Sequence, residues 1–208
     1  MDEAQARALI DVPRGTFDRL EAFIELLTQE NKRQNLVSVA SLDRVWSRHI
    51  LDSAQLPRFA PTTAKTWLDL GAGAGFPGLI VALLHRSTVT LVESRRLRAE
   101  FLNRAAEVLG VAHKTEILCS RIEMLPPSAF DVISARAFAP LDRLLALGAP
   151  FSRPGTRWLL PKGRSAKSEL AAAQASWQGE FRLEPSMTDP EAGIVIAERV
   201  QPRNRGKR

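Results

Sequence analysis

The sequence predicts an α/β fold in which a doubly wound, mostly parallel sheet of seven strands follows an N-terminal helical extension. Three observations lead to this prediction. Short apolar segments alternate with amphipathic ones from about residue 66 onward, the first 60 residues show helical periodicity, and a glycine-rich turn follows the first apolar segment. A chain of 208 residues, 45% of them hydrophobic, can bury the core of one such domain.

Residues 1–60 are predicted to form the helical extension. One face of its first helix is apolar at helical spacing, with Phe17, Leu20, Ile24 and Leu27. Thr16 is predicted to cap this helix at its N-terminus. A second helix is predicted over residues 42–56, because the pattern ends before Pro57.

Strands and helices are predicted to alternate through the following domain, residues 61–200. The predicted strands cover residues 66–70, 87–93, 115–119, 130–134 and 157–160, and the predicted helices cover residues 76–85, 95–109, 141–149 and 165–177. Residues 181–184 and 194–200 are predicted to pair as an antiparallel hairpin. Because such sheets bind ligands beyond the carboxyl ends of their strands, we expect the functional site there.

The helix over residues 95–109 is predicted to pack through an apolar face. This face carries Leu97, Phe101, Ala105 and Val108. Gly110 follows as the expected C-terminal cap.

Composition limits the classes of partner and compartment. The net charge of +6 favours a polyanionic partner, and residues 201–208, predicted to be a disordered basic tail, suit phosphate contact. The only cysteine, Cys119, excludes an intrachain disulfide and is expected to be buried inside its strand. There is no Cys/His cluster of metal-ligand spacing, signal peptide or long apolar segment, so we expect a cytoplasmic protein without metal or membrane contact.

The most informative motif is the glycine-rich loop after the first strand. Residues 69–78 read Asp-Leu-Gly-Ala-Gly-Ala-Gly-Phe-Pro-Gly and lead into a helix. Glycines permit a sharp turn and the close approach of a ligand. Glu93 lies 22 residues after Gly71, at the end of the next strand, where a carboxylate can accept both hydroxyls of an adenosine ribose.

Two classes of cofactor, dinucleotides and S-adenosylmethionine, use this layout. The dinucleotide pattern G-x-G-x-x-G fails when counted from Gly71, since its third glycine position is Phe76, but it fits when counted from Gly73. Asp69 favours S-adenosylmethionine, because an acid at the strand end suits its ammonium and repels a pyrophosphate. The order D-x-G-x-G-x-G is typical of class I methyltransferases, which are Rossmann-like; a tight turn without a ligand is the alternative, and Glu93 argues against it.

A third adenosine contact is predicted in the loop after the third strand. Ile122 can pack on the adenine, and its backbone or Glu123 can meet the base edge. The alternative is that Ile122 belongs to the core and Glu123 to the solvated surface.

Three observations narrow the choice of atom that accepts the methyl group. Methylation of a pyrimidine C5 normally needs a cysteine nucleophile, and Cys119 lies within a predicted strand. Residues 131–138 lack the Asn/Asp-Pro-Pro-aromatic loop usual for exocyclic amines. Guanine N7 carries a free lone pair, so positioning alone suffices there. These observations permit N7 without singling it out.

Six motifs occur together in an order that resembles one family. They are Asn-Leu-Val-Ser (35–38), Arg-His-Ile-Leu-Asp-Ser (48–53), the glycine loop (69–78), Leu-Val-Glu-Ser (91–94), Ser-Ala-Arg-Ala-Phe (134–138) and Lys-Gly (162–163). Over about residues 15–165 the chain resembles the RsmG (GidB) family of bacterial small-subunit ribosomal RNA guanine-N7 methyltransferases. The second motif and Gly-Phe-Pro-Gly are specific to this family, whereas the glycine loop alone indicates only a class I methyltransferase.

The resemblance implies methylation of one guanine in the 530 loop of 16S ribosomal RNA, position 527 in the usual numbering, on naked RNA, the 30S subunit or an assembly intermediate. It also implies cofactor contacts at Gly71, Phe76, Ile122, Glu123 and Arg136. Two departures from the family keep the charge: arginines stand at 95, 96 and 98 where lysines are usual, and Ala135 precedes Arg136 where serine is usual.

The residues and the resemblance together predict a site for S-adenosylmethionine. Its cofactor pocket is predicted to comprise Asp69, Gly71, Gly73, Phe76, Glu93, Ile122, Glu123 and Arg136. The acceptor guanine is predicted to lie among Arg48, His49, Arg136 and Lys162, and the last three are expected to position it without a general base.

Each polar candidate also has a simpler interpretation. His49 can be satisfied by Asp52 within its helix, Arg136 can form a structural ion pair, and residues 95–98 can be solvated surface. Lys162 is interpreted as a phosphate or guanine contact. Trp46 and Trp177 can stack on bases, whereas Trp67 and Trp158 are expected to be core residues.

Three rival functions stay open at this point. A class I methyltransferase for a small molecule or protein does not need the basic tail. A ribosome-assembly factor without catalysis does not need the intact glycine loop with Glu93. An NAD-dependent oxidoreductase is disfavoured by Asp69 and by a chain without tyrosine, which therefore lacks a Tyr-x-x-x-Lys site. We expect the protein to be a monomer.

Overall fold

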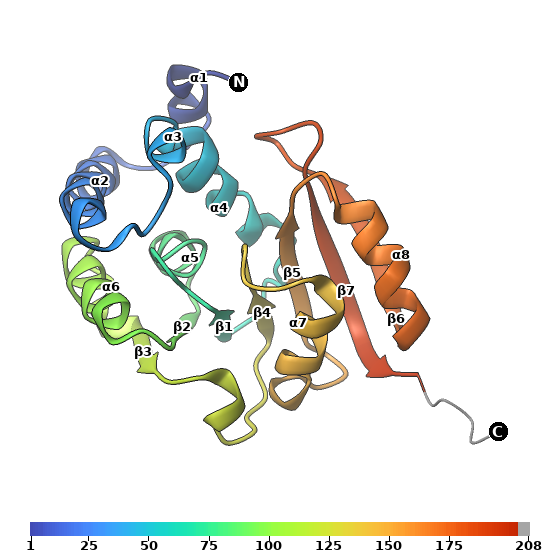
Figure 1. Cartoon of the computed structure of the whole chain (residues 1–208). Coiled ribbons are helices and arrows are strands. Elements are labelled where there is room, and N and C mark those ends of the chain that lie inside the picture. Colours follow the sequence, from blue (N-terminus) through green and yellow to red (C-terminus); the bar gives the residue numbers. More distant parts are fainter. Residues whose placement is uncertain (204–208) are drawn as a thin grey trace.

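The computed structural model describes residues 1–203, and its centre is a seven-stranded sheet in the order β3-β2-β1-β4-β5-β7-β6 (Figure 1). The strands are β1 (Thr66–Leu70), β2 (Thr88–Glu93), β3 (Thr115–Cys119), β4 (Val132–Ser134), β5 (Arg157–Lys162), β6 (Trp177–Pro185) and β7 (Gly193–Pro202). Strands β1 to β5 are parallel, whereas β7 runs antiparallel to both β5 and β6. The predicted doubly wound, mostly parallel sheet is confirmed.

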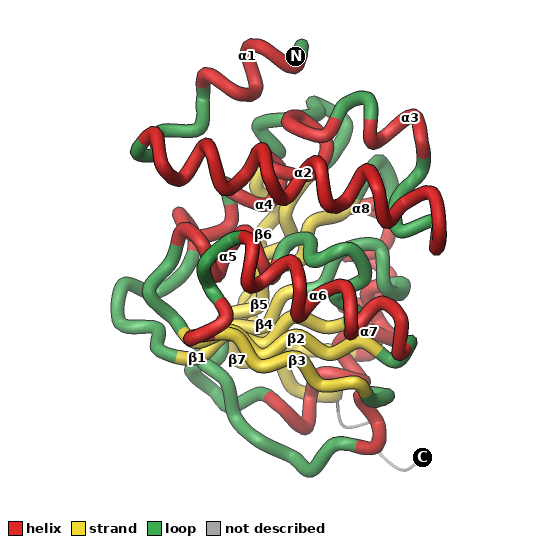
Figure 2. Tube along the Cα trace, turned by 90° about the vertical axis from the view of Figure 1, so that its left-hand side faces the viewer, coloured by secondary structure: helices red, strands yellow, loops and turns green. Residues whose placement is uncertain are grey.

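Helices cover both faces of the sheet. They are α1 (Glu3–Ala8), α2 (Arg14–Gln34), α3 (Val39–Leu42), the π-helix η1 (Trp46–Leu51), α4 (Asp52–Ala54), α5 (Gly78–Leu84), α6 (Arg96–Val108), α7 (Leu141–Gly148) and α8 (Ala166–Ser176), with short 3₁₀ turns η2 (Leu56–Phe59), η3 (Ala112–Lys114), η4 (Ile122–Met124) and η5 (Ala149–Phe151). Helices α5 and α6 pack on one face, with α4 against α5, and α7 and α8 pack on the other (Figure 1). Helix α2 lies on α6, outside it relative to the sheet (Figure 2).

Alternate residues along the strands pack into two separate hydrophobic cores. In β1, Trp67 packs in the core beneath α5 and α6, whereas Leu68 and Leu70 pack in the core beneath α7. The first core continues into the N-terminal helices, since Phe23 of α2 is fully buried against Phe101. Within residues 1–203, no helix is long and apolar enough to span a bilayer.

The N-terminal region differs from its prediction in two ways. Helix α2 starts at Arg14 after Pro13, so the prediction that Thr16 caps it is wrong: Thr16 lies inside the helix and its hydroxyl accepts a hydrogen bond from Arg19. The single helix predicted over residues 42–56 is broken into α3, η1, α4 and η2. Pro57 lies inside η2, because the first turn of a helix needs no N–H from it.

Other burial predictions also need correction. Leu97 and Val108 are 57% and 36% exposed because the buried stripe of α6 is centred on Ala99, Leu102, Ala106 and Leu109, and these two residues lie beside it on the helix; Phe101 and Ala105 are buried as predicted. Cys119 is exposed because it ends the edge strand β3. Gly110 follows α6 with a φ of +70°, as expected of a helix cap.

Three tryptophans and the C-terminal residues can also be compared with their predictions. Trp67 and Trp158 are core residues, as predicted. Trp177 is also buried, and its indole N–H donates to Asp142, so it does not offer a stacking surface. Strand β7 extends to Pro202, and residues 204–208 of the predicted tail lie outside the described residues.

Candidate active site

The loop between β1 and α5 makes its sharp turn at glycines. Gly71, Gly73 and Gly75 have φ values of +68°, +55° and +91°, a region that glycine enters at no steric cost. At Gly78 a Cβ atom would lie 2.7 Å from Oδ2 of Asp69, so only glycine lets α5 start this close to β1. The loop therefore lies at the carboxyl ends of the strands, as the sequence predicts.

The Asp69 carboxylate holds this loop in place through hydrogen bonds. Its side chain is fully buried; Oδ2 accepts from the Gly78 N–H at 3.0 Å, and Oδ1 accepts from the Ser134 hydroxyl at 2.7 Å. Burial raises the pKa of Asp69 to about 7, against the effect of these hydrogen bonds. Asp69 lines neither cavity described below, and its hydrogen bonds shape the loop; the contact with a cofactor ammonium stays a prediction.

Glu93 lines a cavity of about 470 Å³ on one side of the loop. Its Oε2 accepts from the Gly73 N–H at 3.1 Å, and its Oε1 accepts from the Arg95 N–H at 2.9 Å. These two bonds fix the carboxylate at the cavity wall and leave each oxygen a further lone pair. Ile122 and Glu123 line the same cavity, so the structure brings together the three residues predicted around adenosine.

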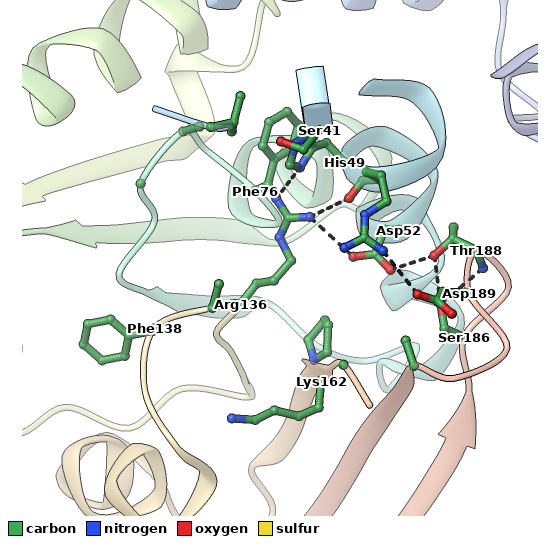
Figure 3. A pocket seen from close by; sticks show the side chains of 18 of the residues that line it. Ser41, His49, Asp52, Phe76, Arg136, Phe138, Lys162, Ser186, Thr188 and Asp189 are labelled. Carbon is green, nitrogen blue, oxygen red and sulfur yellow. Dashed lines mark hydrogen bonds and ion pairs between the residues drawn. The ribbon is translucent and has the colours of Figure 1, made fainter. Parts of the chain in front are cut away.

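A larger cavity of about 960 Å³ lies on the other side of Gly71, and Arg136 forms its floor. The Arg136 guanidinium donates to three acceptors: Nδ1 of His49 at 2.8 Å, the backbone oxygen of Arg48 at 2.8 Å and Oδ2 of Asp52 at 3.4 Å (Figure 3). It also lies 5.2 Å from the centre of the Phe76 ring. The Arg-His-Ile-Leu-Asp-Ser motif therefore holds in one orientation an arginine that lies 84 to 88 residues further along the chain.

His49 is neutral and acts as a hydrogen-bond acceptor for this arginine. Burial, with the Arg136 and Arg48 cations next, lowers the pKa of His49 to about 3. A guanidinium can only donate, so Nδ1 of His49 accepts and Nε2 carries the proton, which it donates to the Ser41 hydroxyl at 3.0 Å. The ring stacks on Phe76 at 4.8 Å. The simpler interpretation, that Asp52 satisfies His49, is wrong, because Asp52 contacts Arg136 instead.

The β6–β7 loop, residues 186–192, closes the far wall of the larger cavity (Figure 3). The Thr188 hydroxyl donates to Oδ1 of Asp52 at 3.1 Å, and Asp189 forms an ion pair with Arg48 at 3.3 Å. No motif in the sequence pointed to a role for this loop. The site thus depends on contacts between the N-terminal helices and the C-terminal hairpin.

The Lys162 ammonium makes two contacts within the protein. Its ammonium donates to the backbone oxygen of Ala139 at 2.8 Å and pairs with Glu169 at 2.9 Å. Two of its three N–H donors are thereby occupied, and the loop after β4 is anchored at Ala139. The role that this geometry supports is positioning of that loop.

Phe138 lies between the two cavities. Its ring covers Gly71 so closely that a Cβ there would meet it at 2.2 Å, yet the side chain is 39% exposed. Ala137, just before it, has a φ of +52°, which is strained for alanine. A ligand that reaches from Glu93 to Arg136 must pass over Gly71 and displace this ring.

Some of these residues were missed by sequence reasoning. Ser134 lies beside Asp69 because β4 pairs with β1, and no local sequence pattern shows that pairing. Ser41 carried no signal, because its link to His49 depends on the π-helix η1.

Comparisons with known proteins show which family the chain resembles. The family model GidB, described as rRNA small subunit methyltransferase G, matches residues 16–189. Proteins named ribosomal RNA small subunit methyltransferase G are similar to the chain: that of Rhizorhabdus wittichii is 54% identical over 100% of this chain and 98% of its own length, and that of Zymomonas mobilis is 48% identical over 93% and 90%.

Solved structures share the fold at low identity. An O-methyltransferase from Bacillus cereus in complex with SAH superposes with a TM-score of 0.62 at 16% identity, over 95% of this chain and 96% of its own. The family model covers the glycine loop, Glu93, His49, Arg136 and Lys162, and the relatives match almost end to end. The resemblance seen in the sequence is therefore confirmed, and the chain belongs to the rRNA small subunit methyltransferase G family.

Proposed function

We propose that this protein transfers the methyl group of S-adenosylmethionine to N7 of a single guanine in 16S ribosomal RNA, guanine 527 of the 530 loop. Membership of the family supports methyl transfer to small-subunit ribosomal RNA. The observation that carries the choice of N7 is that, within residues 1–203, the larger cavity offers no free proton acceptor.

Every side chain of this cavity that could accept a proton already binds a cation of the protein. The lining acids and imidazole are His49, Asp52, Glu169 and Asp189. They bind Arg136, Lys162 or Arg48 within the protein. An acceptor that must lose a proton would lack a base here, whereas guanine N7 presents a lone pair and loses none. Positioning then accounts for catalysis.

The residues present fit S-adenosylmethionine. Glu93 would hold the ribose hydroxyls, Ile122 and Glu123 the adenine, and the backbone at Gly71 and Gly73 would pass beneath the amino-acid end. When bound, this cofactor supplies an electrophilic methyl group on its sulfonium. The protein's part is to bind it, exclude water and hold the acceptor in line.

Arg136 is the residue that best suits orientation of the guanine. Its bonds to Arg48, Asp52 and His49 leave two of its five N–H donors for a ligand. Guanine carries an acceptor, O6, next to N7. A donor directed at O6 orients the base and leaves the N7 lone pair free for transfer.

The test is a transfer assay with purified protein and radiolabelled S-adenosylmethionine. The substrates are 30S subunits and naked 16S RNA from cells that lack the enzyme, and the label is then mapped. We expect label on N7 of guanine 527. We further propose that the protein acts as a monomer.

Two variants sharpen this assay. Glu93→Gln is expected to weaken binding of S-adenosylhomocysteine and to lower transfer, since it removes the ribose carboxylate. Glu198→Gln, whose side chain pairs with Arg157 on the sheet, serves as the control. Label on another atom would exclude N7, and cofactor binding without any transfer to RNA would exclude the ribosomal substrate.

A further inference from the structure

Four arginines surround the mouth of the smaller cavity. Arg95 precedes α6, Arg98 lies in its first turn, Arg121 precedes η4 and Arg143 lies on α7. All are exposed except Arg98, which is partly buried and lines both cavities. We call these four residues the arginine rim.

None of the rim arginines forms an ion pair within residues 1–203. No carboxylate lies within 4.0 Å of any of the four guanidinium groups in the described part of the chain. The two acids of the same cavity are Glu93, which binds backbone N–H groups, and Glu123. Four cations thus face two carboxylates, one of them assigned to the ribose.

The cations of the larger cavity are in the opposite situation. Six basic side chains line it, and four of them have a carboxylate partner: Arg48, Arg136, Lys162 and Arg164, paired with Asp189, Asp52, Glu169 and Glu191. Only Arg44 and the shared Arg98 lack one among residues 1–203. Free positive charge is therefore concentrated at the smaller cavity, away from the β6–β7 loop.

The cofactor does not account for this charge. S-adenosylmethionine carries no phosphate and has a net positive charge, so a ring of arginines repels it. The guanidinium fork matches phosphate oxygens in a bidentate arrangement, and phosphates on a flexible strand can follow cations that come from three separate segments. The chemistry that fits the rim is the phosphodiester backbone of single-stranded RNA.

We propose that the RNA strand crosses the mouth of the smaller cavity with its phosphates on Arg95, Arg98, Arg121 and Arg143, and reaches Arg136 from the adenosine side. This rests on the proposed function, which supplies the RNA substrate. A strand in this position covers the exit of the cofactor. The cofactor therefore binds before RNA and leaves after it.

The first experiment measures the salt dependence of RNA binding. The affinity of an oligonucleotide with the 530-loop sequence is determined between 50 and 300 mM KCl, in the presence of S-adenosylhomocysteine. For Arg95→Ala/Arg121→Ala, the slope of log affinity against log salt should fall by about 1.4, since each phosphate contact on a single strand contributes about 0.7. Arg98→Ala/Arg143→Ala should give a similar fall.

Arg33→Ala/Arg182→Ala is the matched control, because it removes the same two charges from arginines that pair with Glu30 and Glu184 and line neither cavity. It should keep the wild-type slope. A rim variant with the wild-type slope, or a slope that falls only for the control variant, would overturn the proposed path.

The second experiment measures release of S-adenosylhomocysteine by stopped flow. RNA should slow this release several-fold in the wild-type protein and little in the rim variants. Release unaffected by RNA in the wild-type protein would contradict the covered exit. RNA binding that is independent of the rim overturns this inference alone, whereas a wild-type protein that neither binds nor methylates RNA overturns the proposed function with it.

Discussion

At the scale of single residues, the site is organised around groups that hold one another. Arg136 faces the cavity, but its orientation depends on His49, Asp52 and the Arg48 backbone. His49 in turn depends on Ser41 and on the Phe76 ring. Residues that never contact a substrate should therefore affect the rate.

Replacement of His49 should expose this dependence. His49→Ala removes the acceptor of Arg136 Nη2, so methyl transfer should fall by about 10- to 100-fold, while the affinity for S-adenosylhomocysteine changes little. His49→Gln keeps an acceptor oxygen and should recover part of the rate. Single-turnover kinetics and calorimetry separate the two quantities. Equal losses of rate in both variants would show that the hydrogen bond is not what matters.

Replacement of Phe138 should strengthen ligand binding instead of impairing function. Its ring covers Gly71, so a cofactor that spans the two cavities must first displace it. If the open position is about 10% populated, Phe138→Ala should tighten binding of S-adenosylhomocysteine by about 10-fold. Calorimetry measures this directly. Weaker binding would mean that the ring packs on the cofactor rather than in its way.

At the scale of elements, the glycine loop is held by a strand-end carboxylate. Trp67 donates to Ser134, Ser134 donates to Asp69, and Asp69 also accepts from Gly78 at the start of α5. This chain joins β4, β1 and α5. Its members are buried, so the loss of one acceptor leaves donors without water or a partner.

Asp69→Ala should therefore destabilise the fold by about 1–3 kcal/mol, the usual cost of an unsatisfied buried donor, and should weaken cofactor binding through the loop. Asp69→Asn should be milder at neutral pH, since its oxygen accepts from Gly78 and its amide donates to Ser134. Chemical denaturation and calorimetry compare the two. A fully stable Asp69→Ala variant would show that the loop does not rely on this acceptor.

At the scale of the whole molecule, two buried groups make opposite contributions to the pH dependence of stability. Asp69 has a pKa of about 7 against an ordinary value of 3.8, so the folded state holds an extra proton between these values and stability from it is lost as pH rises through 7. His49 has a pKa of about 3 against 6.5, so the unfolded state holds the extra proton and stability falls as pH drops below 6.5.

The free energy of unfolding should therefore vary little with pH, as far as these two groups decide it, between about pH 4 and 6.5. Asp69→Asn leaves only the His49 effect, so the variant should lose about 1.4 kcal/mol more than the wild type for each pH unit of acidification. His49→Gln should show the reverse difference. Urea denaturation at pH 5 and 6 checks both. Parallel profiles for all three proteins would refute the assigned pKa shifts.

Much of the fold follows from the sequence because its signals are local. The alternation of apolar strands with amphipathic helices determined the order of the elements, and the glycine loop with Glu93 located the cofactor side of the sheet. What failed depended on distant contacts. No local pattern shows that Asp69 turns under its loop toward Ser134, or that an interrupted helix carries His49 and Asp52 to Arg136. Likewise, β3 exposes Cys119 because no further strand follows it at that edge.

The place of β7 has a consequence for how the molecule is made. This strand is the last of the seven in the chain, yet it lies between β5 and β6, and the loop before it binds Arg48 and Asp52. While the chain emerges from the ribosome, the glycine loop and the strand that ends at Glu93 can form early. At that stage β5 still has an unpaired edge, and the cavity around Arg136 lacks the wall formed by the β6–β7 loop. A nascent chain therefore cannot become an active enzyme until its final strand has been synthesised and inserted.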